Sequence, residues 1–217
     1  MRLILAASMP RAGSTWMYNA ARLVLLQSPT VARSFGAGWV GDIDKLPRKR
    51  TLLIKIHDYS APLLQHATQV IYCYRDIREA LASLERKFGT PPTLALADHM
   101  VAQYNHWIKH AQIVMSYEEM MQDKAKVVNT LAQLFNVHLS TPASVLNELS
   151  QLSYASSPDT RSFNHSSYNA TNLYHPQHIT SGKIGSHGHQ LDPELAQAIV
   201  DKHRDWFIAR GYLAAKI

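Results

Sequence analysis

The chain has 217 residues, of which 46% are apolar and 18% are charged, and its formal net charge at pH 7 is +6. This composition can fill a hydrophobic core, so it excludes wholesale disorder, and the length suits a single domain over residues 1–217. The one cysteine, Cys73, excludes an internal disulfide and favours a cytoplasmic location. No apolar run approaches the roughly 18 residues of a membrane span, so we expect none.

Short apolar runs alternate with segments of helical periodicity along the chain. The runs predict strands at 2–7, 51–57, 68–74 and 112–116. The periodic segments predict helices at 15–26, 76–88, 93–110, 124–135, 142–151 and 192–210. We expect residues 27–50 to be irregular and residues 153–180 to form a polar loop. The alternation predicts a three-layer α/β fold, with a largely parallel central sheet flanked by helices.

The loop after the first predicted strand has the features of an anion site. Gly13 permits a tight turn before the first helix, and Arg11 adds a positive charge. Backbone N–H groups would face outward at the start of this helix, and they belong to Ser14, Thr15 and Trp16. The loop is similar to a nucleoside-triphosphate P-loop, but Ser8 and Ser14 replace its first Gly and its Lys.

Polar residues also follow the next two predicted strands, at the edge where parallel α/β sheets bind ligands. Lys55 and His57 alternate along their strand and therefore lie on the same side. An unperturbed His titrates near pH 6.5, which suits a general base. Arg75 ends the third predicted strand and offers a bidentate fork to phosphate oxygens, and Ser83 lies eight positions later.

These motifs resemble those of sulfotransferases that use 3′-phosphoadenosine 5′-phosphosulfate (PAPS). The family's 5′-phosphosulfate loop reads Pro-Lys-Ser-Gly-Thr-Thr-Trp, and residues 10–16 read Pro-Arg-Ala-Gly-Ser-Thr-Trp. Lys55-Ile56-His57 is similar to the family's Lys-x-His element, and Arg75 and Ser83 have the family's separation. The resemblance extends over residues 3–212, with a Tyr-Glu-Glu segment at Tyr117 and a similar end to the last helix.

The resemblance implies a P-loop-like fold and sulfuryl transfer from PAPS to an acceptor hydroxyl or amine, with PAP as product. It implies that His57 is the general base, and that Lys55 and Arg11 contact the transferring group. It further implies that Arg75 and Ser83 bind the 3′-phosphate. The remaining nucleotide contacts that it implies are Gly13, Ser14, Thr15, Trp16 and Tyr117, with Trp16 and Tyr117 near the adenine.

The family's late Arg-Lys-Gly-x-x-Gly loop is only partly present. Gly182 and Gly185 have the spacing of its two glycines, but Thr180 and Ser181 replace the Arg-Lys pair. Lys183 is the candidate for the missing charge. The resemblance therefore assigns Gly182, Lys183 and Gly185 to the 3′-phosphate as well.

Two alternatives to a sulfotransferase remain open at this point. A P-loop kinase would use Mg-ATP, with Thr15 and either Asp58 or Asp76 binding Mg²⁺. A nucleotide-binding module would bind PAP without catalysis.

We expect no metal ion, because the histidines between residues 165 and 189 lack regular ligand spacing. We expect no nucleic acid partner either, since the basic run at 48–50 is short enough to be a solvated loop. The acceptor would be a small molecule, a glycan or a lipid. Its site would be bordered by residues 34–49, 86–96 and 153–180, with the last acting as a lid.

Overall fold

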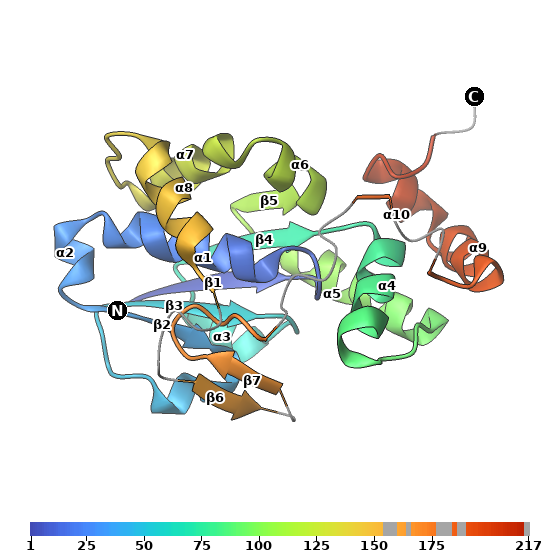
Figure 1. Cartoon of the computed structure of the whole chain (residues 1–217), viewed down its shortest axis with the longest axis horizontal. Helices are drawn as coiled ribbons and strands as arrows, with labels where there is room; N and C mark the ends of the chain where they lie inside the picture. The colour runs from blue at the N-terminus through green and yellow to red at the C-terminus, as the bar shows by residue number, and fades with distance from the viewer. Residues whose placement is uncertain (154–159, 164–165, 177–183, 186–189, 215–217) are drawn as a thin grey trace.

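The computed structural model describes residues 1–153, 160–163, 166–176, 184–185 and 190–214. Its core is a parallel sheet in the order β2-β3-β1-β4-β5 (Figure 1). The strands of this sheet are β1 (Arg2–Ser8), β2 (Phe35–Trp39), β3 (Thr51–Ile56), β4 (Gln69–Tyr74) and β5 (Ile113–Ser116). A second sheet pairs β6 (Thr160–Phe163) with β7 (Ser166–Asn169) in antiparallel fashion. The predicted α/β fold with a parallel sheet is confirmed.

The central strands are buried on both faces, which explains their continuous apolar sequences. Every residue of β3 is buried, and in β1 only the first residue is partly exposed. The register places Ala6 of β1 opposite Lys55 of β3 and Ile71 of β4. The carboxyl ends of the three strands therefore lie side by side, and the residues that follow them meet at one edge.

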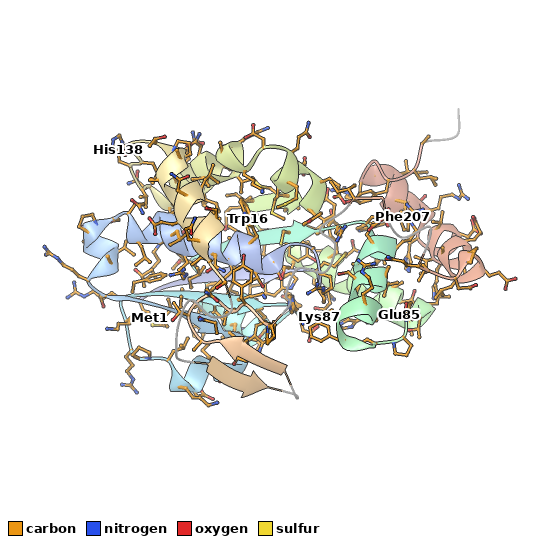
Figure 2. The ribbon with its side chains drawn as sticks, in the orientation of Figure 1. Met1, Trp16, Glu85, Lys87, His138 and Phe207 are labelled. Carbon is orange, nitrogen blue, oxygen red and sulfur yellow. The ribbon has the colours of Figure 1, made fainter. Side chains whose placement is uncertain are left out.

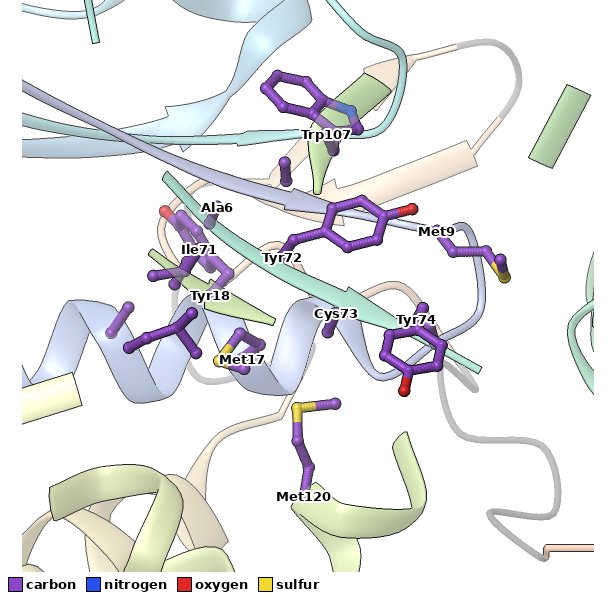
Figure 3. Packing of buried hydrophobic residues seen from close by; sticks show 14 of the residues in the cluster. Ala6, Met9, Met17, Tyr18, Ile71, Tyr72, Cys73, Tyr74, Trp107 and Met120 are labelled. Carbon is purple, nitrogen blue, oxygen red and sulfur yellow. The ribbon is translucent and has the colours of Figure 1, made fainter. Parts of the chain in front are cut away.

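Helices cover both faces of the sheet. Helix α1 packs against α7 and α8 on one face, and Figure 3 shows Trp107 of α5 on the opposite side of β4 from Met17 of α1. The helices are α1 (Ser14–Leu26), α2 (Pro29–Ala32), α3 (Ala61–His66), α4 (Ile77–Phe88), α5 (Leu94–Trp107), α6 (Tyr117–Gln122), α7 (Lys124–Phe135), α8 (Pro142–Gln151), α9 (Pro193–Lys202) and α10 (Arg204–Ala209), with a 3₁₀ turn η1 (Val40–Lys45). In the part of the chain that the structure describes, no helix combines the length and apolar character needed to span a membrane.

The segment expected to be irregular, 27–50, contains α2, the edge strand β2 and η1. The strand was missed because two of its five residues are Gly36 and Gly38, which weaken the apolar pattern of a strand. Both glycines lie close to leucine side chains that a larger residue would have to displace. A Cβ at Gly36 would lie 2.8 Å from Leu52 Cδ2, and one at Gly38 would lie 3.0 Å from Leu46 Cδ2.

Two further expectations were wrong in detail. Residues 153–180 are not only loop, since β6 and β7 lie within them. The helix predicted over 192–210 is divided at His203, whose φ of −115° and ψ of 28° are not helical. His203 Nε2 lies 2.8 Å from Asp98 Oδ1 of α5, so a tertiary contact accompanies the break. The short helices α3 and α6 were not predicted.

The segment that follows β7 is anchored to α1. Asn19 of α1 is fully buried, and its Nδ2 donates to the carbonyl oxygens of Thr15 and Asn172, both at 2.8 Å. Tyr18 Oη donates to the Thr171 carbonyl oxygen at 3.1 Å. These bonds hold residues 171–172 against α1, although about 150 residues separate them in sequence.

Candidate nucleotide and catalytic site

The loop between β1 and α1 has the backbone of an anion site. Arg11 and Gly13 have positive φ angles of 62° and 76°, and Gly13 is the N-cap of α1. The first helical hydrogen bond runs from Met17 N to Gly13 O at 3.0 Å. The preceding N–H groups, those of residues 14–16, have no carbonyl within the helix to bind, so they can bind an anion.

Lys55 brings an ammonium group from β3 to this loop. Its Nζ donates to Thr15 Oγ1 at 2.7 Å, and only 5% of the residue is exposed. The pKa of Lys55 is lowered to about 7, chiefly by burial; Cys73 opposes this shift and the charge of Arg11 adds to it. Because this pKa lies close to neutral pH, an anion bound beside Lys55 would raise the fraction of the side chain that is protonated.

His57 is positioned by the end of β1. Its Nδ1 lies 2.9 Å from the Ser8 carbonyl oxygen and 3.0 Å from Ser8 Oγ. Because a carbonyl oxygen only accepts hydrogen bonds, Nδ1 carries the proton and Nε2 keeps its lone pair. Burial, and then the charge of Lys55, lower the pKa of His57 to about 4. The imidazole is therefore neutral at pH 7, with Nε2 available to take a proton.

Arg11 and Ser83 come together across 72 positions of sequence. Arg11 Nε donates to Ser83 Oγ at 3.0 Å, and its guanidinium lies 5.8 Å from the centre of the Phe88 ring. Burial lowers the pKa of Arg11 to about 10, and Arg75 and Arg86 lower it through repulsion. Arg11, bonded to Ser83, is therefore close enough to two further guanidinium groups to be affected by their charges.

Arg75 is buried between α4 and α6. Its Nη2 donates to Glu79 Oε2 at 3.2 Å, and its Nε lies 4.0 Å from Glu118 Oε1. The guanidinium stacks 4.3 Å from the centre of the Tyr117 ring. Tyr117 in turn packs on the loop, because a Cβ at Gly13 would lie 2.9 Å from Tyr117 Cδ2. Gly13, Arg75 and Tyr117 thus form one packed unit.

The structure brings most of the predicted site residues to one edge of the sheet. Those that it links by the contacts above are Arg11, Gly13, Thr15, Lys55, Arg75, Ser83 and Tyr117, with His57 bonded to the end of β1 beside them. Ser14 is buried and Trp16 is partly exposed in the first turn of α1. Gly182 and Lys183 lie outside the described residues. Gly185 is exposed with a φ of 77°, and a Cβ there would meet no described atom within 4 Å.

Three contacts at this edge were not predicted from the sequence. The carbonyl of Ser8 acts through its backbone, which no sequence motif reports. Trp39 lies in the unpredicted strand β2, with its ring 5.3 Å from the His57 ring and 5.9 Å from Lys55 Nζ. Arg86 was not singled out, although its position three residues after Ser83 on a predicted helix gave a usable signal.

The residues that a kinase would need for Mg²⁺ have other contacts. Thr15 Oγ1 accepts from the Lys55 ammonium, which would repel a divalent cation. Asp58 pairs with His99 at 3.0 Å, and Asp76 accepts from Nε and Nη2 of Arg78. Within the described ranges, no group of three His, Cys, Asp or Glu side chains could hold a metal ion. Of the histidines between 165 and 189, only His175 belongs to those ranges.

Several solved structures share the fold of this chain. Solved structures similar to the chain include a mouse sulfotransferase, SULT7A1, complexed with PAP (16% identity, TM-score 0.62, 96% of this chain and 87% of that one). They also include retinol dehydratase with retinol and PAP (13% identity, TM-score 0.58, 95% and 82% of the two chains). A third is retinol dehydratase with androsterone and inactive cofactor PAP (13% identity, TM-score 0.60, 95% and 81%). No curated protein sequence matches significantly.

The sulfotransferase domain model matches residues 94–207, which is more than half of the chain. The match begins after Arg11, Lys55, His57, Arg75 and Ser83, so it is independent of the motifs in the first half of the chain, whereas the Tyr117 segment and the two late glycines lie inside it. The motifs in the first half and the family match in the second half lead to the same conclusion. The chain belongs to the sulfotransferase domain family.

Proposed function

We propose that this chain transfers a sulfuryl group from PAPS to the hydroxyl or amine of an acceptor. The observation that carries the proposal is the pairing of Lys55 and His57. One strand presents a buried ammonium bonded to the anion loop and, two residues later, a neutral imidazole with Nε2 free to accept a proton. The PAP in the similar structures supports the choice of donor.

In this proposal the first turn of α1 binds the 5′-phosphosulfate. The N–H groups of Ser14, Thr15 and Trp16 point toward it, and Arg11 and Lys55 supply positive charge. The acceptor oxygen or nitrogen attacks sulfur while the bond from sulfur to the bridging phosphate oxygen breaks. The acceptor proton passes to His57 Nε2, and the electron pair stays on the leaving phosphate. Lys55 and Arg11 stabilise the charge that develops there.

The remaining nucleotide contacts are also proposals. Arg75 and Ser83 would bind the 3′-phosphate, as a buried guanidinium fork and a hydroxyl. Trp16 and Tyr117 would pack against the adenine. Gly182, Lys183 and Gly185 are carried over from the family's late loop alone. PAPS serves as the only cofactor, and no metal ion takes part.

The acceptor enters beside His57 and Trp39 in this proposal. We propose a small-molecule, glycan or lipid acceptor rather than nucleic acid, with residues 34–49, 86–96 and 153–180 around it. The similar retinol dehydratase structures hold retinol and androsterone, which supports a small molecule. We further propose that residues 1–217 form one domain and that the protein acts in the cytoplasm, where a lone buried cysteine stays reduced.

The proposed function is tested by transfer of labelled sulfate from PAPS to a panel of phenols, alcohols, amines and sugars. We expect labelled product with at least one acceptor class. His57→Ala should lower the turnover about 100-fold or more while PAP still binds, because a general base contributes about 10²–10⁴ in rate. His138→Ala is the matched control. His138 is exposed, and Figure 2 shows it far from Glu85 and Lys87 of α4, the helix that carries Ser83 of the candidate site. PAP binding without transfer to any acceptor would favour the nucleotide-binding module instead.

A further inference from the structure

Arg86 has two buried donor atoms without a hydrogen-bond partner among the described residues. These atoms are Nε and Nη1, and both are inaccessible to solvent. A guanidinium is always charged near neutral pH, and leaving its buried N–H groups unsatisfied is costly. Natural structures rarely keep such groups without a reason, such as a catalytic role or a bound ion.

Arg86 also has a defined direction. It follows Ser83 by three residues on α4, so the two side chains lie on the same face, one turn apart. Ser83 Oγ accepts a hydrogen bond from Arg11, so this face of α4 is turned toward the loop between β1 and α1. The Arg86 side chain therefore lies next to the place where Arg11 and Ser83 meet.

The local charge is unbalanced. Arg75 has a carboxylate partner in Glu79, at 3.2 Å. For Arg86, the described residues contain no carboxylate within ion-pair distance, and its charge adds to the repulsion that Arg11 experiences. A phosphate monoester carries close to two negative charges and three strong acceptor oxygens. Such a group would offset the repulsion and satisfy the buried donors together.

We propose that Arg86 binds the 3′-phosphate of the donor nucleotide, as a second guanidinium beside Arg75 and Ser83. This inference rests on the proposed function, because it concerns the same nucleotide. The 5′-phosphosulfate already has the N–H groups of the first turn of α1 and Lys55. Arg86 instead lies beyond Ser83 on a different helix, so it serves the other phosphate. It supplies from α4 the positive charge that Thr180 and Ser181 cannot supply.

The test compares PAP with adenosine 5′-phosphate, which lacks the 3′-phosphate, by titration calorimetry. Arg86→Gln should weaken PAP binding by about tenfold or more, equivalent to about 1.4 kcal/mol. The same variant should change the affinity for adenosine 5′-phosphate by less than about twofold, within the scatter of surface substitutions. Arg33→Gln is the matched control, because Arg33 is exposed and precedes the amino end of β2, at the opposite edge of the sheet from Ser83, and it should show no such selectivity.

The outcomes separate this inference from the proposed function. If the unmodified protein does not prefer PAP to adenosine 5′-phosphate, the proposed function fails. If it prefers PAP and Arg86→Gln keeps that preference, only the role of Arg86 is overturned. An equal loss for both ligands also overturns it, because Arg86 would then act on the shared part of the nucleotide. Should Arg86→Gln fail to fold, Arg86→Lys keeps the charge without the fork and should still weaken PAP selectively.

Discussion

At the scale of single residues, the candidate site contains a lysine whose charged form is destabilised by burial. Burial lowers the pKa of Lys55 from 10.5 to about 7, so the native state disfavours its charge. Between these two pH values the unfolded chain binds more protons than the native chain. The free energy of unfolding should therefore rise with pH from about 7 toward 10.5.

Replacement of Lys55 by an apolar residue should stabilise the protein and impair binding. We expect Lys55→Met to raise the free energy of unfolding at pH 7 by roughly 1–4 kcal/mol, the range found when buried ion pairs are replaced by apolar residues. The variant should also lose the rise in stability with pH. Urea denaturation at pH 7 and pH 9 measures both effects, and a fall in stability at pH 7 would contradict the cost assigned to Lys55.

The same lysine should make nucleotide binding depend on pH. An anion beside Lys55 favours the ammonium and raises its pKa, so binding above pH 7 should take up a proton. We expect PAP affinity to fall as pH rises above 7, by at most about tenfold per pH unit for one proton. Calorimetry in buffers of different ionisation enthalpy measures the uptake, and Lys55→Met should abolish it. Proton uptake that persists in that variant would assign the effect to another group.

At the scale of elements, the junction of β1, α1 and α6 decides the shape of the anion loop. Gly13 has to adopt a positive φ, and it has to leave room for the Tyr117 ring. We expect Gly13→Ala to cost about 1–2 kcal/mol of stability from the left-handed backbone alone. The contact at 2.9 Å should add to this loss and displace Tyr117 from Arg75, which would weaken PAP binding.

Gly211→Ala separates the two causes. Gly211 has a φ of 75°, close to that of Gly13, but a Cβ there would meet no described atom within 4 Å. It should therefore show the backbone cost without the loss of PAP binding. Thermal unfolding and PAP titration of both variants make the comparison. Equal behaviour of the two would show that Tyr117 does not constrain the loop.

At the scale of the whole molecule, the second half of the chain is tied to the first through Asn19. Loss of this side chain would leave the Asn172 carbonyl oxygen and Arg22 Nε without one partner each. We expect Asn19→Ala to lower stability by about 1–3 kcal/mol and to expose residues near 171–172 to proteolysis. Gln27→Ala on the same helix is the control, because its long side-chain bonds of 3.4 Å should matter little. Similar proteolysis of both variants would contradict the anchoring role.

The sequence predicted the parallel sheet, and the gathering of the candidate site residues at one edge of it, because both follow local rules. Buried parallel strands are continuous apolar runs, and alternation along β3 placed Lys55 and His57 together. The tautomer of His57 was not predictable, since it depends on a backbone carbonyl of another strand. Strand β2 was not predictable either, because its glycines have low strand propensity and their close packing against Leu46 and Leu52 is visible only in the folded structure. Long-range contacts account for what local pattern missed.

The central claim is that the site binds a nucleotide with a 3′-phosphate, and titration calorimetry with PAP, ADP and ATP tests it most directly. We predict that PAP binds at least about tenfold more tightly than either ADP or ATP, a difference of about 1.4 kcal/mol. Mg²⁺ should not reverse this order of affinities, because the Thr15 hydroxyl that would bind it already accepts a hydrogen bond from Lys55. Equal binding of the three nucleotides, or tighter binding of Mg-ATP, would contradict the account and favour a kinase.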